Sequence, residues 1–150
     1  MKKYKIERVG DLEHPLFFLR IYSSKKPLRF LLDSGCDSNA IFPSTLKNCD
    51  LFETGAKESI MTGNGMIESP VMLITVKLSR KDVPIALSVR VLDNQVEKSF
   101  RCYNCHGLLG AQFIQCCKID FRNLWIEIPE KGGALSLLQH DGKYLSSLNR

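Results

Sequence analysis

The chain has 150 residues, of which 44% are hydrophobic, and a net charge of +5 from lysines and arginines spread along its length. That length suits one compact domain with a substantial core. No apolar run reaches the roughly 18 to 20 residues that a membrane span needs. The N-terminus MKKYKIERVG lacks the apolar core of a signal peptide. The sequence therefore predicts a cytoplasmic protein with reduced thiols, and it favours neither a membrane nor a nucleic-acid partner.

The first part of the chain predicts two strands that lead into an acidic loop. Residues 15–22 would place Phe17, Leu19 and Ile21 on one face of a strand. A polar turn separates them from a second, largely apolar run over 28–32. Asp33 follows that run directly, and Asp37 lies four residues further on. A buried carboxylate is costly unless it is paired, hydrogen-bonded or protonated. The loop is therefore either a structural turn or a chemical site.

Little regular structure is predicted immediately after this loop. Residues 43–46, Pro-Ser-Thr-Leu, are typical of a short helical turn. Residues 51–57 are expected to be irregular. Within them Glu53-Thr54-Gly55 is similar to Asp33-Ser34-Gly35, but it has the wrong acid to repeat that motif and is interpreted as a surface loop.

A hairpin and two long strands are predicted next. Gly63-Asn64-Gly65 lies between two apolar pairs, and residues that adopt positive φ easily favour a tight reversal. Residues 71–79 and 83–93 then alternate apolar and polar side chains, which predicts strands that each bury one face.

The last third predicts short elements. An apolar pair ending in Gly110 precedes residues 111–117, which can form two helical turns. Residues 118–121 and 124–128 are expected to be short strands. Residues 129–150 are expected to be a tail that is either flexible or associated with a dimer.

The six cysteines leave alternatives open. Cys102, Cys105 and His106 have the spacing of covalent haem attachment, but the sequence has no leader and no obvious axial methionine. Zinc is the stronger rival, because these three side chains and Cys116 or Cys117 would supply four ligands. Buried thiols and no cofactor are the expected state.

Together these features resemble the retropepsin-like aspartic proteases over residues 14–128. The catalytic turn of that family reads Asp-Thr/Ser-Gly, and Asp33, Ser34 and Gly35 match it residue by residue. The later GLLGAQFI matches an apolar pair and glycine followed by a short helix. The resemblance implies an all-β barrel of a single lobe, with a flap hairpin and one short C-terminal helix, over residues 1–128.

The resemblance also implies an activity, that of an aspartic endopeptidase. Such enzymes use two carboxyl groups that share a proton, one as general base on water and the other as general acid. The chain has one such motif, so the second carboxyl is expected from Asp33 of a partner copy in a homodimer. Ser34 would bond across the dimer axis, and Gly35 would allow close backbone approach. The residues expected to bind a peptide substrate are Asp37 and those of the flap, Thr62, Gly63, Asn64 and Gly65.

Two points stay open at this stage. Retroviral members place an arginine after the late glycine to meet the second acid, whereas Ala111 and Gln112 stand here, so the partner of Asp37 is not identified. The alternative function is a non-catalytic binding or dimerisation module of the same fold, with a structural zinc at Cys102, Cys105 and His106.

Overall fold

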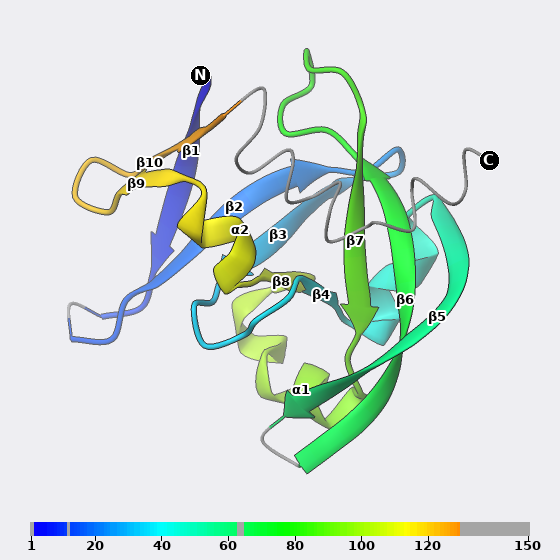
Figure 1. Cartoon of the computed structure of the whole chain (residues 1–150). Helices are drawn as coiled ribbons and strands as arrows, with labels where there is room; N and C mark the ends of the chain where they lie inside the picture. Colours follow the sequence, from blue (N-terminus) through cyan, green and yellow to red (C-terminus); the bar gives the residue numbers. More distant parts are fainter. Residues whose placement is uncertain (1, 12, 63–64, 130–150) are drawn as a thin grey trace.

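The structure is a computed structural model that describes residues 2–11, 13–62 and 65–129 (Figure 1). Its strands are β1 (Lys2–Val9), β2 (Leu16–Tyr22), β3 (Pro27–Leu32), β4 (Ala40–Ile41), β5 (Leu51–Thr62), β6 (Gly65–Val76), β7 (Ile85–Val91), β8 (Gly107–Leu109), β9 (Lys118–Asp120) and β10 (Trp125–Ile128). Its helices are the 3-10 helices η1 (Pro43–Asn48) and η2 (Arg101–Tyr103) and the α-helices α1 (Asn94–Ser99) and α2 (Ala111–Gln115). No helix among these residues is long and apolar enough to cross a membrane.

The strands form one sheet in the order β5-β6-β7-β4-β8-β3-β2-β1-β10-β9. The predicted all-β class is thereby confirmed, and α2 is the predicted short C-terminal helix. The two predicted N-terminal strands are β2 and β3, which pair antiparallel with Leu19 opposite Phe30. Strand β1 was not predicted, because only Ile6 in it is fully buried and its charged residues hide the alternation. Its pairing with β2 and β10 determines its conformation.

The predicted hairpin is formed by β5 and β6, with Met61 opposite Met66 near its end. Gly63 and Asn64 lie outside the described residues. The expectation that residues 51–57 are irregular is wrong, because they belong to β5. The pairing shifts register between Glu53 and Lys57, where Gly55 has a φ of +80°. This irregularity breaks the alternation from which the sequence would otherwise predict a strand.

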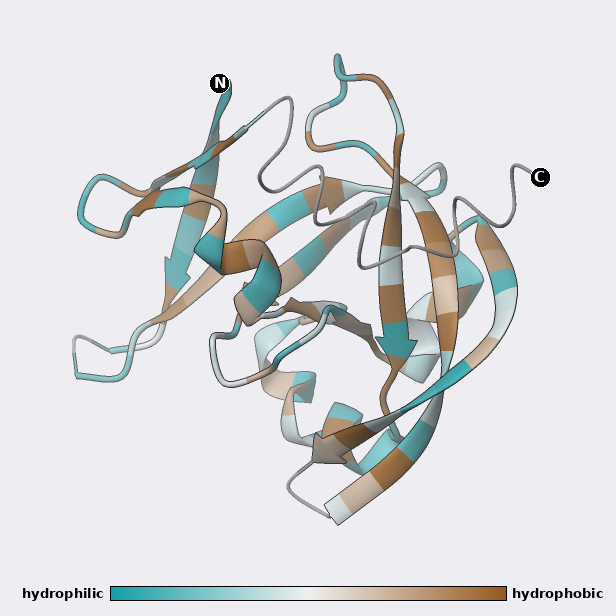
Figure 2. Cartoon of the chain, in the orientation of Figure 1, coloured by the Kyte–Doolittle hydropathy of each residue, from teal (hydrophilic) through white to brown (hydrophobic). Residues whose placement is uncertain are grey.

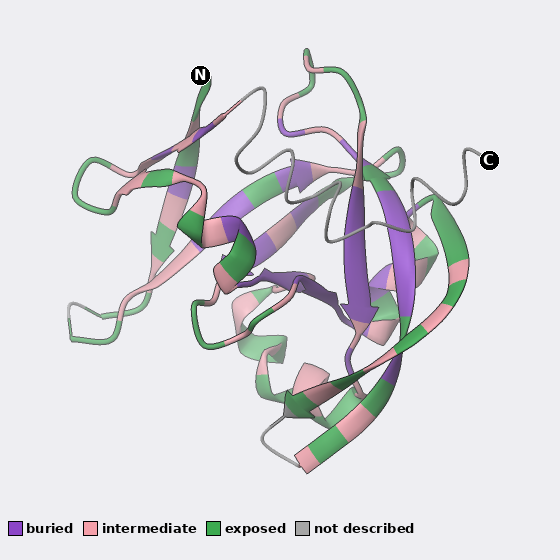
Figure 3. Ribbon diagram, viewed as in Figure 1, coloured by how far each residue is buried: buried purple, intermediate pink, exposed green. Residues whose placement is uncertain are grey.

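The centre of the sheet is buried on both faces, and this determines where the site lies. Strands β3 and β8 run parallel, with Leu31 opposite Leu108. Phe30 and Leu109 pack into the main core cluster, whereas Leu31 and Leu108 pack into a second cluster on the other side. Both β4 and β8 are apolar (Figure 2) and buried (Figure 3). A strand buried on both faces tends to have a continuous apolar sequence, as Phe30, Leu31 and Leu32 do, and the chain becomes polar again at Asp33.

The segment after β7 contains one element that was not predicted. Helix α1 begins after Asp93, whose side-chain oxygen accepts a hydrogen bond from the Val96 N–H at 2.8 Å. This is an ordinary N-cap, and the aspartate at the end of an apolar strand was its signal in the sequence. Strands β9 and β10 confirm the two short strands that were predicted. The predicted tail lies almost wholly outside the described residues.

Candidate active site

Asp33 follows β3 directly and continues its pairing with β8. Its N–H donates to the carbonyl of Leu109 at 2.9 Å, one residue beyond the last strand pair. Its Oδ1 atom accepts a hydrogen bond from the Gly35 N–H at 3.0 Å. The Asp33 carboxyl is half-buried. The end of the doubly buried strand therefore holds this carboxyl in a fixed orientation.

Gly110 and the first two residues of α2 hold the acidic loop, residues 33–39, in place. The Ala111 N–H donates to the carbonyl of Cys36 at 2.6 Å, and the Gln112 N–H donates to that of Asp37 at 3.3 Å. The side-chain oxygen of buried Asn39 accepts from the Gly110 N–H at 3.1 Å. These bonds join the acidic loop to the GLLGAQFI segment, which lies far from it in the sequence.

Gly110 is required by this contact. A Cβ atom added to it would lie 2.6 Å from the carbonyl oxygens of Cys36 and Ser38. Real Cβ atoms do not approach backbone that closely, so any other residue at position 110 would push the start of α2 away from the acidic loop. The packing of these two segments therefore requires glycine at position 110, whether or not the protein is an enzyme.

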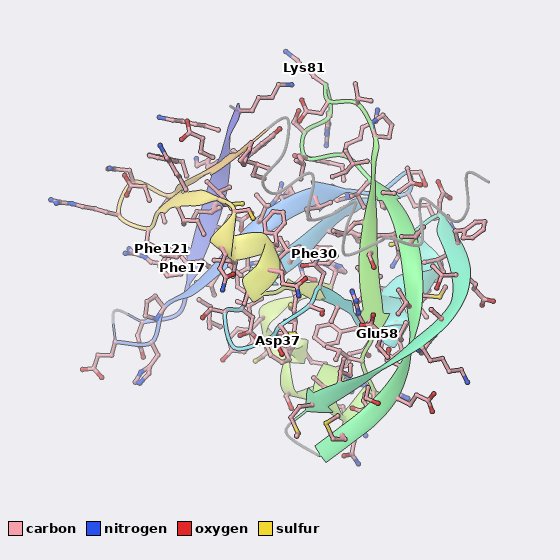
Figure 4. All side chains as sticks on the ribbon, in the orientation of Figure 1. Phe17, Phe30, Asp37, Glu58, Lys81 and Phe121 are labelled. Atoms are coloured by element: carbon pink, nitrogen blue, oxygen red, sulfur yellow. The ribbon has the colours of Figure 1, made fainter. Side chains whose placement is uncertain are left out.

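A cavity of about 340 Å³ opens beside Asp33. It lies between the acidic loop and strand β5 of the hairpin, with α1 and the end of β7 forming the rest of its wall. Its lining residues are Asp33, Gly35, Cys36, Asp37, Ser38, Asn39, Ala40, Glu58, Ser59, Ile60, Met61, Arg90, Leu92, Val96, Phe100 and Leu108. Figure 4 shows Asp37 on the loop and Glu58 on the strand side.

An ion pair between Glu58 and Arg90 forms part of the cavity wall. The Nε and Nη2 atoms of Arg90 lie 2.8 and 2.6 Å from Oε2 of Glu58, and Nη1 lies 3.4 Å from Oγ of Ser88. Only 4% of the Arg90 side chain is exposed, against 34% for Glu58. Glu58 is opposite Ser69 on β6 and Arg90 is opposite Val71, so the pair links β5 to β7 across β6.

Sequence reasoning did not find this pair. The alternation of residues 83–93 predicts a strand that buries one face and leaves Arg90 exposed, but this prediction is wrong for β7, whose residues 87–90 are all buried. A buried guanidinium needs an acidic partner, but the burial of Arg90 is visible only in the structure. Glu58 could not be chosen for that role because its segment was not recognised as a strand.

Cys36 follows Gly35 in the acidic loop and lines the cavity. Its Sγ donates to the carbonyl of Ser38 at 3.0 Å. Burial raises the pKa of the Cys36 thiol, and the nearby carboxylates Asp33 and Asp37 raise it further. A thiol with a raised pKa is protonated at neutral pH, and a protonated thiol is a poor nucleophile.

The remaining predicted site residues have different placements. Ser34 is exposed, and its side chain makes no hydrogen bond within the described part of the chain. Asp37 is also exposed, and its carboxylate makes neither a hydrogen bond nor an ion pair with any described residue. Thr62 and Gly65 pair at the end of the hairpin. The structure thus brings Asp33, Gly35 and Asp37 to one cavity beneath the strand that leads to Thr62.

The structure does not bring together the residues that suggested a zinc site. Cys102 is exposed, Cys105 donates to the carbonyl of Gly107, and Nδ1 of His106 accepts from the Arg29 N–H at 2.9 Å. Cys116 packs against the other core cluster. The described residues, which include all of these, hold no group of three or more His, Cys, Asp or Glu side chains arranged to bind a metal. Spacing in the sequence suggested a cluster that the fold separates.

Comparison with known proteins gives a distant structural similarity. No family model matches the chain, and no curated protein matches it. A retropepsin-like aspartic protease from Rickettsia conorii is 16% identical with a TM-score of 0.47, over 84% of this chain and 98% of that one. A protein of unknown function from Legionella pneumophila is 17% identical with a TM-score of 0.35, over 62% and 79%. Similarity at this level assigns neither a family nor an activity to this chain.

Proposed function

We propose that the protein is an aspartic endopeptidase of the retropepsin-like type that acts as a homodimer. In this proposal Asp33 of each copy contributes one carboxyl to a shared site at the dimer axis. Two like charges at hydrogen-bonding distance cannot both ionise, so the two carboxyls hold one proton between them. The ionised carboxyl takes a proton from water, and the protonated one donates to the carbonyl oxygen of the peptide bond.

The observation that carries this proposal is the setting of Asp33. A half-buried carboxyl stands at the end of a doubly buried strand, is oriented by the Gly35 N–H, and faces a cavity on whose far side lies a long hairpin strand. A structural turn would need the hydrogen bond but not the cavity. The hydrogen bonds from Gly110, Ala111 and Gln112 hold the loop that carries the carboxyl, which supports a site that is ordered before substrate binds.

The other predicted residues have supporting roles in this proposal. Exposed Ser34 is available to bond across the axis, and Gly35 leaves room beside the carboxyl. The hairpin of β5 and β6, with Thr62, Gly63, Asn64 and Gly65 at its end, acts as a flap. An extended peptide would lie beneath it as an added strand, and closure would exclude water from the reaction.

The test is the substitution Asp33→Asn, which keeps the size of the side chain and the acceptor for the Gly35 N–H. Wild-type protein is incubated with a diverse mixture of unfolded peptides from acid to neutral pH, and new termini are identified by mass spectrometry. The proposal predicts cleavage that a pepstatin-like inhibitor blocks, and loss of at least about a thousandfold in the variant. Sedimentation of the variant must still show a dimer.

A different result would support the other candidate, a non-catalytic binding or dimerisation module. That outcome is wild-type protein that sediments as a dimer but cleaves no peptide at any pH. A protein that remains monomeric even with peptide present would contradict the shared site itself.

A further inference from the structure

The cavity beside Asp33 has a charge opposite to that of the whole protein. The chain carries a net charge of +5. The described residues that line the cavity include three carboxylates, Asp33, Asp37 and Glu58, and one cation, Arg90. A concave surface with partly apolar walls concentrates the electric field of the charges that line it. The cavity is therefore suited to a group that carries positive charge.

The one cation in this lining is already engaged. Arg90 is buried and directs Nε and Nη2 at the Glu58 carboxylate on the β5 side of the cavity. Asp37 lies on the loop opposite (Figure 4), and its carboxylate has no hydrogen-bond or ion-pair partner among the described residues. Ala111 and Gln112 stand at the position where the resemblance led us to expect a cation, and they donate backbone hydrogen bonds to the loop. A cationic ligand can thus meet Asp37 without displacing a described contact.

The wall between these two sides is apolar. Leu92 and Leu108 are buried in the second core cluster. Val96 in α1 and Phe100, which follows α1, pack against that cluster. A wall of this kind covers an alkyl stem, which a small inorganic cation does not possess. Lysine and arginine side chains combine such a stem with a charged head.

We infer that this cavity is a subsite for a basic side chain of the substrate, with Asp37 binding the cationic head and the Leu92, Phe100 and Leu108 wall covering the stem. The inference rests on the proposed function and names the substrate class of that same site. It also supplies a partner for Asp37, which has none among the described residues. Asp37 is here a specificity-determining residue, and Arg90 positions Glu58 on the opposite rim.

The expected discrimination follows from the chemistry of the pair. A charge-assisted hydrogen bond favours an arginine over an uncharged side chain of similar length by on the order of tenfold to a hundredfold. Glutamate at the same position would place its carboxylate against that of Asp37 and should be rejected more strongly than the uncharged residue.

The experiment first maps cleavage sites in the diverse peptide mixture. Wild-type protein should show enrichment of Lys and Arg at one position within a few residues of the cleaved bond. Matched peptides with Arg, norleucine or Glu at that position then give ratios of kcat/KM. Asp37→Asn should reduce the Arg-to-norleucine ratio to within about threefold, and Asp37→Arg should reverse the preference toward Glu. The control Asp50→Asn removes an exposed carboxylate that does not line the cavity and should leave the ratio unchanged.

Cleavage without basic enrichment at any position overturns the subsite and leaves the protease intact. The same result is expected if a second copy supplies a cation to Asp37, in which case Asp37→Asn would weaken the dimer. A ratio that survives Asp37→Asn and Asp37→Arg also overturns the inference.

If wild-type protein cleaves nothing, the proposed function fails and the subsite is judged by binding. Isotope-labelled protein is then titrated with N-acetyl-arginine methylamide and N-acetyl-norleucine methylamide, and backbone amide shifts are followed by NMR. Shifts at Asp37 and Leu108 that only the arginine probe produces, and that Asp37→Asn removes, support the subsite. Equal shifts with both probes, or none, overturn it.

Discussion

The ion pair of Glu58 and Arg90 gives the sharpest prediction about stability. Glu58→Gln keeps the size of the side chain but leaves the Arg90 charge buried without its carboxylate. Removing one partner of a fully buried pair costs about 3 to 5 kcal/mol. Because the Glu58 side chain is 34% exposed, water can reach part of the site, and we expect a loss of about 2 to 3 kcal/mol in the free energy of unfolding.

The measurement is urea denaturation followed by far-UV circular dichroism, with Arg20→Gln as the matched control. Arg20 pairs with Glu7 at 3.0 Å, but their side chains are 49% and 41% exposed. Breaking that pair should cost less than about 1 kcal/mol. The double variant Glu58→Gln/Arg90→Met should recover part of the loss, because it no longer buries a guanidinium that has lost the Glu58 carboxylate. The reasoning is refuted if Glu58→Gln lowers the free energy of unfolding no more than Arg20→Gln does. It is also refuted if adding Arg90→Met to the Glu58→Gln variant restores no stability.

Three further predictions concern the loops and the pH dependence. Gly110→Ala should destabilise the protein by about 3 kcal/mol in urea, because its Cβ meets two carbonyl oxygens at 2.6 Å; Gly35→Ala, whose Cβ meets only Asp33 Oδ1 at 3.3 Å, should cost clearly less, and equal costs would contradict the packing argument. Burial, with Lys26 and Arg29, lowers the pKa of His106, so its contribution to stability is complete above the unfolded pKa of about 6.5 and is lost as pH falls through the folded value. His106→Asn should flatten that part of the pH profile of urea midpoints, whereas the exposed control His14→Asn should not. Identical pH profiles for the two variants would contradict the role of His106. Hydrogen bonds from Lys2 and Tyr4 lower the pKa of Asp82, so Asp82→Asn should lose stability at neutral pH, with the difference from wild type fading below about pH 4; a difference that persists at pH 2 would rule out this origin.

The sequence was sufficient where the signal was local. Asp33 marks the point at which a doubly buried strand becomes polar, and the run RFLL before it is visible without a structure. The Gly63-Asn64-Gly65 segment predicted the β5–β6 hairpin in the same way, because turn residues between apolar pairs favour a reversal. The short helix α2 after Gly110 was likewise predicted from adjacent residues.

The features that were missed depend on distant partners. Strand β1 exists because β2 and β10 flank it, and the first half of β5 is hidden by the register shift at Gly55. The pair of Glu58 with Arg90 joins residues 32 positions apart. The separation of Cys102 from Cys116 has the same origin, since spacing along the chain does not give distance in the fold. Contacts of this kind are set by sheet order, which one sequence does not reveal.

The account depends most on the claim that two copies of Asp33 form one catalytic site. The most direct measurement is a subunit-mixing titration, in which wild-type protein at fixed concentration is equilibrated with increasing amounts of Asp33→Asn protein before cleavage is assayed. If each active site needs Asp33 from both copies, activity per wild-type chain should fall in proportion to the wild-type mole fraction, to about half in an equal mixture. Activity per wild-type chain that stays constant, although sedimentation of tagged subunits shows that mixed dimers form, would contradict the shared site.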